Sequence, residues 1–330
     1  MKKVFVVLFC VILFCRVSVL QAQVIEVGDL TYNVLSDTSV GVLSCSQSAK
    51  SVIIPSTIKY KGTSYNVTSI DEGAFADCSY LKSVSISSNV NNIGANAFSD
   101  CSSLKTVSIP NGVTNIGFNA FSDCSSLKTV SIPNSVTNIG FNAFSDCSSL
   151  SKVEIPNSVV SIEAWAFSGC TSLSSISIPN SVTSIGYGAF SSCTSLTSIN
   201  VSSDNKNYSS VDGVLYNYAK DTLIQCPGAK VSVTIQNDVT VIGDYSFTDC
   251  KFLTSVTIPN SIISIGRNAF SGCFSLTSTV SLTETPPILG HDCFYGCNAK
   301  NVLYIPCGSM IVYQSSSWND WFANRVQCIK

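Results

Sequence analysis

The only histidine of the chain lies where chemistry could be expected. The run His291-Asp292-Cys293 is followed by Cys297 and Cys307. A thiol beside an imidazole can act as a nucleophile with its base, and cysteines with a histidine can bind zinc. However, the segment from Cys293 to Cys297 aligns with a recurring pattern, Ala-Phe-Ser-Gly-Cys, which places both cysteines in buried positions. A thiol- or metal-dependent enzyme at this end is therefore a remote alternative, and we expect no catalytic, metal-binding or cofactor-binding residues.

Carboxylates and glycines recur as well, but at a fixed spacing. A glycosidase needs two carboxyl groups that face each other across a cleft, whereas one carboxyl group per repeat forms the rungs of a repeated turn. Glycines at positions 94, 117, 140, 186 and 266 recur in the same way and most simply serve a turn, not a phosphate-binding loop. We therefore expect a protein that is not an enzyme. The recurring carboxylates, each directly before a cysteine, are Asp77, Asp100, Asp123 and Asp146.

These residues are columns of an internal repeat of 23 residues. Residues 116–136 are a clean copy of the template, Ile-Gly-x-x-Ala-Phe-x-x-Cys-x-x-Leu-x-x-Val-x-Ile-Pro-x-x-Val. The distance from Ile185 to Ile242 exceeds two periods, which predicts a longer, different coil over residues 202–241. Copies begin at Ile70, Ile93, Ile116, Ile139, Ile162, Ile185, Ile242 and Ile265, with a degenerate copy around Leu289.

The apolar positions of one copy predict its local structure. Val107 and Ile109 alternate with polar residues, which indicates a short strand with one buried face, and Pro110 ends it. The stretch 119–127 has apolar spacings that suit an inward-facing helical turn. A single coil cannot bury these side chains, so neighbours must stack, continuously from about residue 70 to 305. We predict an α/β repeat solenoid, a leucine-rich-repeat-like stack of 23-residue coils with a parallel β-sheet face and capped ends.

The template resembles the BspA-like leucine-rich repeat. Cys-x-x-Leu-x-x-Val-x-Ile-Pro followed by Val-Thr-x-Ile-Gly-x-x-Ala-Phe is similar to that family's repeat from Ile70 to about Pro306. The long coil resembles a family variant, Asn-Tyr-x-x-Val-Asp-Gly-Val-Leu-Tyr at 207–216, which we interpret as part of a protruding hairpin. The resemblance implies surface proteins associated with adhesion to host matrix proteins or other cells, and it carries no binding residues across.

The N-terminus predicts export. Two lysines precede an apolar run from Val4 to Phe14, and Ala22 offers a small residue for cleavage, so residues 1–22 are expected to be a signal peptide. A membrane span is the competing interpretation, but Arg16 interrupts the run, which is shorter than the roughly 20 apolar residues that a bilayer needs. No later stretch is long and apolar enough. We expect a secreted or cell-surface protein with no membrane span in the mature chain.

A stack of coils exposes apolar surface at both ends and needs caps. Residues 23–69 lack the repeat but contain strand-like segments, so they are expected to form an N-terminal cap on the repeats of 70–281. Residues 282–330 are expected to hold a degenerate last repeat and a C-terminal cap. A plug for the last coil explains the three aromatic residues at helical spacing there better than a sugar-binding site does: Trp318, Trp321 and Phe322.

The cysteines raise the question of disulfides in an exported protein. Fourteen of the sixteen follow the expected cleavage site, and nine share one position of the repeat. Parallel side chains in the same rotamer do not offer the near-perpendicular torsion of a disulfide, so we expect the column to behave as buried, unreactive thiols. Cys307 and Cys328 in the cap are better disulfide candidates. The column consists of Cys78, Cys101, Cys124, Cys147, Cys170, Cys193, Cys250, Cys273 and Cys297.

Composition and the repeat together indicate the kind of partner. Charged residues make up 12% of the chain, the net charge is −2 and no basic cluster is present, which argues against nucleic acid. A repetitive, extended surface suits a large ligand. We therefore expect a protein-binding or adhesion scaffold with a protein or cell-surface ligand, which the sequence does not name. A passive structural spacer or coat component of the cell surface is the alternative.

The outward side chains of the strands are the candidate binding face. Short hydroxyl side chains lose little rotamer freedom on contact, so a ribbon of them can meet a large partner at a small ordering cost. Lys152 and Glu154 interrupt the ribbon with charge, and a solvated cross-strand pair is the simplest explanation of them. The candidate residues are Thr106, Ser108, Thr129, Ser131, Lys152, Glu154, Ser175, Ser177, Ser198 and Asn200.

Overall fold

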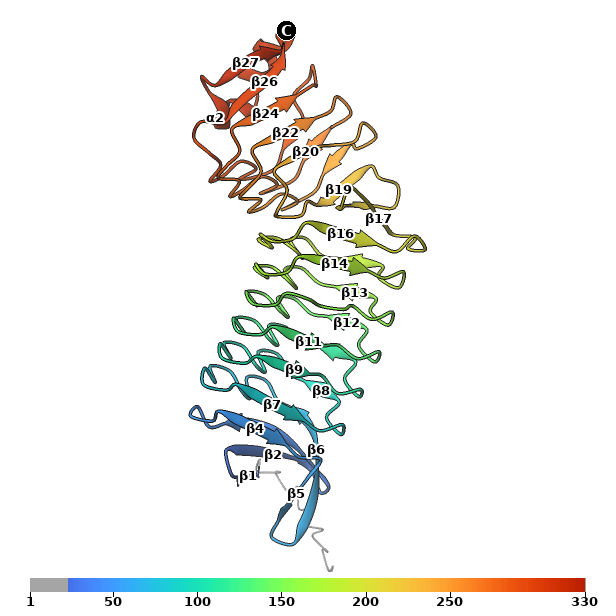
Figure 1. The fold of residues 1–330 in the computed structure, drawn as a ribbon, viewed down its shortest axis with the longest axis vertical. Coiled ribbons are helices and arrows are strands. Elements are labelled where there is room, and N and C mark those ends of the chain that lie inside the picture. The colour runs from blue at the N-terminus through green and yellow to red at the C-terminus, as the bar shows by residue number, and fades with distance from the viewer. Residues whose placement is uncertain (1–22, 330) are drawn as a thin grey trace, which may run out of the picture.

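The chain winds into a stack of coils that forms an elongated solenoid (Figure 1). The computed structural model describes residues 23–329, and the expected signal peptide lies outside these residues. Successive coils pair residue for residue, with Val107 beside Val130 and Ile116 beside Ile139. The sequence repeat is therefore the structural repeat. Within the described part, no helix has the length and apolar character needed to cross a membrane.

Two narrow parallel sheets line the solenoid. The strand face is built from the first strand of each coil, and the second sheet is built from two-residue strands that end at the column isoleucine. In the N-terminal half, the second sheet is continuous and the strand face is divided into pairs of strands, whereas over residues 232–329 the strand face is one five-stranded sheet. The paired strands of the strand face are β4 (Ser51–Ile54) with β7 (Ser83–Ile86), β9 (Thr106–Ser108) with β11 (Thr129–Ser131), and β14 (Ser175–Ile178) with β16 (Ser198–Val201). The second sheet contains β8 (Asn92–Ile93), β10 (Asn115–Ile116), β12 (Asn138–Ile139), β13 (Ser161–Ile162) and β15 (Ser184–Ile185).

The third side of each coil is a series of turns, so the expected helical return was wrong. Asn119 and Asp123 have positive φ values of 51° and 59°, which an α-helix does not allow and which Asn and Asp tolerate better than most residues. Backbone N–H groups alternate in direction as a result. Ala120 donates within its own coil, whereas Phe121 donates to Ala143 of the next coil at 2.8 Å. Helices within residues 23–329 occur only near the C-terminus, and the fold is a β-solenoid.

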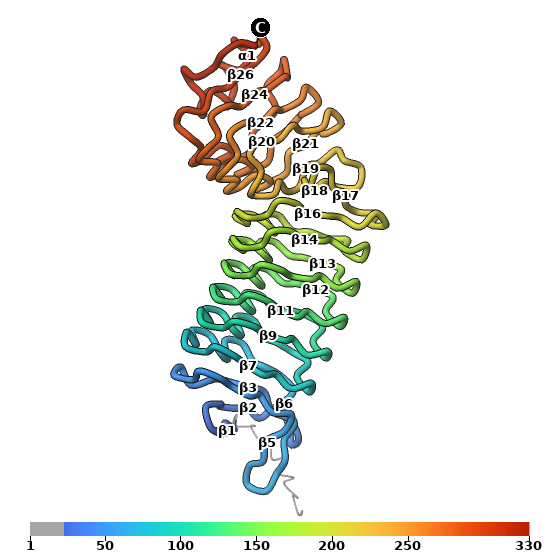
Figure 2. Tube along the Cα trace, in the orientation of Figure 1, coloured from blue at the N-terminus to red at the C-terminus, as the bar shows by residue number. Residues whose placement is uncertain are grey.

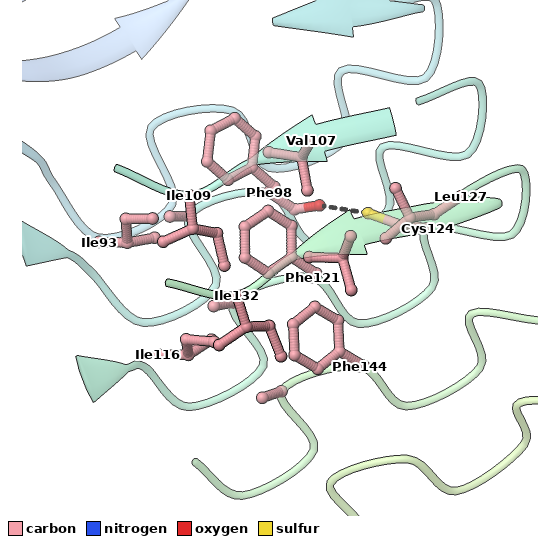
Figure 3. Packing of buried hydrophobic residues seen from close by; sticks show 14 of the residues in the cluster. Ile93, Phe98, Val107, Ile109, Ile116, Phe121, Cys124, Leu127, Ile132 and Phe144 are labelled. Carbon is pink, nitrogen blue, oxygen red and sulfur yellow. Dashed lines mark hydrogen bonds between the residues drawn. The ribbon is translucent and has the colours of Figure 1, made fainter. Parts of the chain in front are cut away.

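Stacked side chains fill the interior. The rings of the Phe column from Phe75 to Phe190 lie nearly parallel, with neighbouring centroids 4.7 to 5.8 Å apart. The column cysteines are free thiols, and Cys124 Sγ donates to the Phe98 carbonyl of the preceding coil at 3.2 Å (Figure 3). Each buried apolar side chain contributes roughly 1.5–3 kcal/mol, so the stacking of coils supplies the stability that one coil lacks.

The N-terminal region is joined to both sheets. β4 pairs in parallel with β7, and β6 (Thr63–Ile70) pairs in parallel with both β3 (Ser39–Cys45) and β8. Coil-like pairing therefore begins upstream of Ile70. The end is completed by antiparallel strands, β1 (Val24–Val27) and β2 (Leu30–Ser36), and by β5 (Thr57–Tyr60), which forms a hairpin with β6.

Two short helices close the C-terminal end. Trp318 and Phe322 are buried against Phe294, the last ring of the Phe column, with centroids 5.6 and 5.0 Å away. The Trp318 indole N–H donates to the Pro287 carbonyl at 2.8 Å, whereas Trp321 is half-buried. The elements of this end are β24 (Ser278–Ser281), β25 (Ile288–Leu289), β26 (Val302–Pro306), η1 (Cys307–Ser309), α1 (Met310–Gln314), α2 (Trp318–Phe322) and β27 (Val326–Ile329), which pairs in parallel with β26.

The long coil interrupts the stack. Its strands β17 (Tyr208–Val211), β18 (Val214–Asn217) and β19 (Thr222–Gln225) form an antiparallel meander, and β19 continues the second sheet through β21 (Val241–Ile242). The expected hairpin is therefore present, but it is built into a sheet. The core divides here into two clusters, with Leu215 in one and Val214 in the other, and the stack changes direction (Figure 2). The last strand within residues 202–241 is β20 (Ser232–Thr234), and beyond the long coil follow β22 (Ser255–Ile258) and β23 (Ser264–Ile265).

The turn side is interrupted at the same place. The ring stack that ends at Phe190 resumes at Phe247. Ser192 Oγ donates to Asp249 Oδ2 at 2.6 Å, so the turns on either side of the long coil are in direct contact although 57 positions separate the two residues.

An aromatic cluster covers this junction. Trp165 crosses Gly188 to reach Tyr245, with ring centroids 4.7 Å apart, and a Cβ at Gly188 would lie 2.5 Å from the indole. Tyr187 stacks on Tyr245 at 5.4 Å, and the Arg267 guanidinium lies over both tyrosine rings at 5.4 and 5.3 Å. The aromatic cluster, Trp165, Tyr187, Tyr245 and Arg267, therefore joins the two halves of the solenoid.

Replacing Trp165 with Ala should weaken this junction, because both tyrosines lose an edge contact. We expect the free energy of unfolding to fall by about 2 kcal/mol and the two halves to unfold at separate urea concentrations. Circular dichroism reports on both halves. Tryptophan fluorescence of the variant reports on the C-terminal half alone, since only Trp318 and Trp321 remain.

Phe118→Ala is the matched control. Phe118 is an exposed ring that stacks on Phe141 at 5.4 Å within the N-terminal half. Its loss should leave the unfolding transitions coincident. If fluorescence and circular dichroism also coincide for Trp165→Ala, the aromatic cluster does not couple the halves.

Candidate functional site

The residues around His291 do not converge on a reactive site. The His291 side chain is 84% exposed and its Nδ1 lies 2.7 Å from Asp292 Oδ2. Cys293 is fully buried, and burial raises the pKa of its thiol. Cys297 Sγ donates to the Phe270 carbonyl at 3.0 Å, as Cys273 Sγ does to the Phe247 carbonyl at 3.2 Å. Across residues 23–329, no group of three or more His, Cys, Asp or Glu side chains is arranged to hold a metal ion.

The recurring aspartates lie in a line along the turns. All four have positive φ between 56° and 60°, so each occupies the left-handed position of a turn. The pKa of Asp100 is raised by its burial and then by the like charges of Asp123 and Asp77. These aspartates therefore supply the left-handed residue of each turn, and their carboxylates repel one another mildly. This agrees with the expected repeated turn.

The strand face presents the expected polar ribbon. Nine of the ten candidate side chains are exposed and Ser198 is half-buried, whereas the alternate residues such as Val107 and Val130 are buried. Lys152 Nζ lies 2.7 Å from Glu154 Oε1, and both side chains are largely exposed. Their hydrogen bond raises the pKa of Lys152 and lowers that of Glu154. The pair is solvated, as expected, but the expectation of a cross-strand pair was wrong, because both residues lie in the same coil.

Hydroxyl groups are used differently on different sides of the coil. At the turns, Ser148 Oγ donates to the Ser125 carbonyl at 3.2 Å, and at the corner Ser158 Oγ donates to the Val136 carbonyl at 2.7 Å. On the strand face, the hydroxyls of Thr129 and Ser131 make no hydrogen bond to another described residue and point to solvent. These two hydroxyls are thus free to bond an external group, whereas Ser198 Oγ accepts a hydrogen bond from Asn200 Nδ2 at 3.4 Å.

The strand face also has two hollows that sequence reasoning missed. One, of about 230 Å³, lies beside the Lys152–Glu154 pair, where a single bridge from Thr129 to Lys152 replaces regular strand pairing. The other, of about 490 Å³, lies between the turn at Asp212 and β20 and is lined by Tyr216, Lys230 and Thr234. The break in the 23-residue period at 202–241 was the available signal for the second hollow.

A third hollow lies away from the strand face. It has a volume of about 580 Å³ and lies between residues 260–263 and residues 282–288, with exposed Ile263 and Ile288 among its lining residues. Its lining mixes these isoleucines with polar residues such as Glu284, so it is less polar than the ribbon.

Replacing Asp123 with Asn tests the charge of the aspartate column. Asn tolerates the same left-handed backbone but removes a negative charge beside Asp100. Because the folded state raises the pKa of Asp100, the stability contributed by this carboxyl is complete below its ordinary value of 3.8 and falls as the pH rises through the folded pKa. We expect Asp123→Asn to stabilise the protein by about 0.3 kcal/mol at pH 7 and to have no such effect at pH 3.

Urea unfolding at the two pH values measures this difference. Asp238→Asn, an exposed aspartate outside the column, is the control and should show little effect at either pH. Equal effects of Asp123→Asn at pH 3 and pH 7 would show that the carboxylates of neighbouring coils do not repel one another.

Comparisons with known proteins agree with this architecture. A family model described as the BspA type leucine rich repeat region matches residues 44–151, 114–217 and 221–319, with six copies. The match begins upstream of Ile70, as the pairing of β4 with β7 does. No curated protein matches the chain.

Several solved structures share the fold. A leucine rich cell surface protein from Faecalibacterium prausnitzii is 30% identical, with a TM-score of 0.64, over 87% of this chain and 89% of that one. A leucine-rich repeat protein from Eubacterium ventriosum is 21% identical, with a TM-score of 0.54, over 85% of this chain and 76% of that one. The pneumococcal vaccine antigen PcpA is 16% identical, with a TM-score of 0.54, over 93% and 97%. The last two show the fold alone. Because the family model matches most of the chain, the protein belongs to the BspA-type leucine-rich repeat family.

Proposed function

We propose that this protein is an exported, non-enzymatic scaffold that binds a protein partner at or outside the cell surface, and that it does so through its strand face. The observation that carries this proposal is the ribbon of outward-facing side chains, most of which are short hydroxyls. At the turns and corners, many residues of the same types are bonded inside the fold, as Ser148 is to the Ser125 carbonyl. On the strand face, a regular array of them faces solvent, where the hydroxyls can exchange hydrogen bonds with a partner.

Three further observations support this function. The 30% identical protein from Faecalibacterium prausnitzii is described as a cell surface protein, which supports the same location for this chain. The apolar N-terminal run supports export. The dispersal of the aspartates along the stack and the burial of Cys293 support a scaffold in preference to an enzyme.

A passive spacer or coat component is the second candidate. The near-identity of the coils from Ile93 to Val159 favours it, since a spacer needs only a soluble surface and a stable stack. A spacer should bind nothing specifically, so a binding measurement separates the two functions.

The double variant Thr129→Arg, Ser131→Arg tests the strand face. Two bulky cations in the middle of the ribbon should leave folding intact, within about 0.5 kcal/mol, and weaken binding by about tenfold or more. Binding of the chain from Gln23 onward is measured on immobilised matrix and cell-surface proteins, with melting curves of each variant recorded in parallel.

The matched control adds the same charge elsewhere. Thr114→Arg, Thr137→Arg places two arginines beside the second sheet, at exposed equivalent positions of neighbouring coils, and should bind normally. Undiminished binding by the strand-face variant, together with loss on deletion of residues 217–221, would move the site to the long coil. No saturable binding by the unmodified chain would favour the spacer.

A further inference from the structure

The C-terminal cap contains two cysteines unlike the others. Cys307 and Cys328 are exposed, whereas the remaining described cysteines are buried or, for Cys297, half-buried. Cys307 begins η1 and Cys328 lies in β27, the last strand of the sheet. An oxidant in solution can therefore reach these two thiols and not the thiol column.

The strand register places the two side chains together. β27 pairs in parallel with β26, and Ile305 is the register partner of Cys328. Cys307 directly follows Pro306, the last residue of β26 and the register partner of Ile329, so its backbone lies beside the end of β27 that contains Cys328. Cys307 Sγ donates to the carbonyl of Ile329, the residue after Cys328, at 3.2 Å.

The thiols are also direct neighbours. The pKa of Cys307 is raised, first by a hydrogen bond with the Cys328 thiol. Some thiols of the column are paired in the same way, but Cys124 shows the difference: it is fully buried and its Sγ is held by the Phe98 carbonyl. Among the cysteines of residues 23–329, proximity and exposure of both thiols occur together only in the cap.

We propose that Cys307 and Cys328 form a disulfide when the protein meets an oxidising small-molecule disulfide or a thiol oxidase. One cysteine loses its proton and attacks a sulfur of the oxidant, which breaks the oxidant's S–S bond and releases one thiol. The second cysteine then loses its proton and attacks the mixed disulfide, which forms the protein S–S bond and releases the second thiol. The protein loses two protons and two electrons, and the oxidant is reduced to two thiols.

The disulfide would secure the plug of the solenoid. Cys307 and Cys328 are 21 positions apart in the sequence, and the segment between them contains α1 and α2, and thus both rings that cover Phe294. Closing this loop restricts the unfolded cap and holds β27 on β26. The inference rests on the cap geometry and does not depend on what the strand face binds, so failure of the binding experiment leaves it intact.

Peptide mapping tests the disulfide. The purified chain is incubated with oxidised glutathione, alkylated in denaturant and digested with trypsin, which cuts after Lys300 and Arg325 and so separates the two cysteines. We expect peptides 301–325 and 326–330 to be linked, with a mass lower than their sum by two hydrogens, while the column cysteines are alkylated. The apparent melting temperature should rise by roughly 5 °C and return on reduction.

Cys307→Ser and Cys328→Ser are the matched controls, and neither should show a linked peptide or a change in melting temperature with oxidised glutathione. Glutathione adducts on both cysteines of the unmodified chain without a linked peptide would overturn the proposal. A link between either cysteine and a column cysteine would overturn it as well.

Discussion

The structure depends on the direction of the backbone N–H groups in the turns. With left-handed residues at positions such as Asn119 and Asp123, alternate N–H groups leave their own coil and bond the next one, as Phe121 bonds Ala143. A single coil therefore leaves polar backbone groups unsatisfied, and only stacking removes that cost. The same bonds hold equivalent residues at one spacing, so the Phe rings stack and thiols of the column such as Cys124 donate to a carbonyl of the preceding coil.

Much of this architecture could be predicted from the sequence, because apolar spacing records which side chains are buried. The turns could not be recognised in the same way, since Ala120, Phe121, Cys124 and Leu127 have spacings that suit a helix as well as a series of turns. The distinguishing signal was the recurring Asn and Asp, whose tolerance of positive φ favours turns. The sequence repeat did not reveal the first coil, because the segments that form β4 and β6 lack the Ala-Phe-x-x-Cys pattern.

The candidate binding face was predictable in its residues but not in its shape. The alternation of polar and apolar residues from Thr106 to Ile109 predicts which side chains face outward. The hollows depend on how neighbouring coils meet: one arises where the coil of Lys152 pairs by a single bridge, and the other where the long coil replaces a regular strand. Pairing defects of this kind have no local sequence pattern, because the residues that produce them lie a full coil or more apart.

Aromatic residues gather at two interruptions of the stack, the long coil and the C-terminal end. The long coil has no Phe of the column, and the aromatic cluster around Trp165 lies over that junction. The stack ends at Phe294, and Trp318 and Phe322 cover it. In a solenoid, each coil is stabilised by its neighbours, so the weakest interface between coils limits how cooperatively the whole stack unfolds. A partner that spans the long coil would contact strands of both halves, and its affinity would then depend on the junction that sets the angle between them.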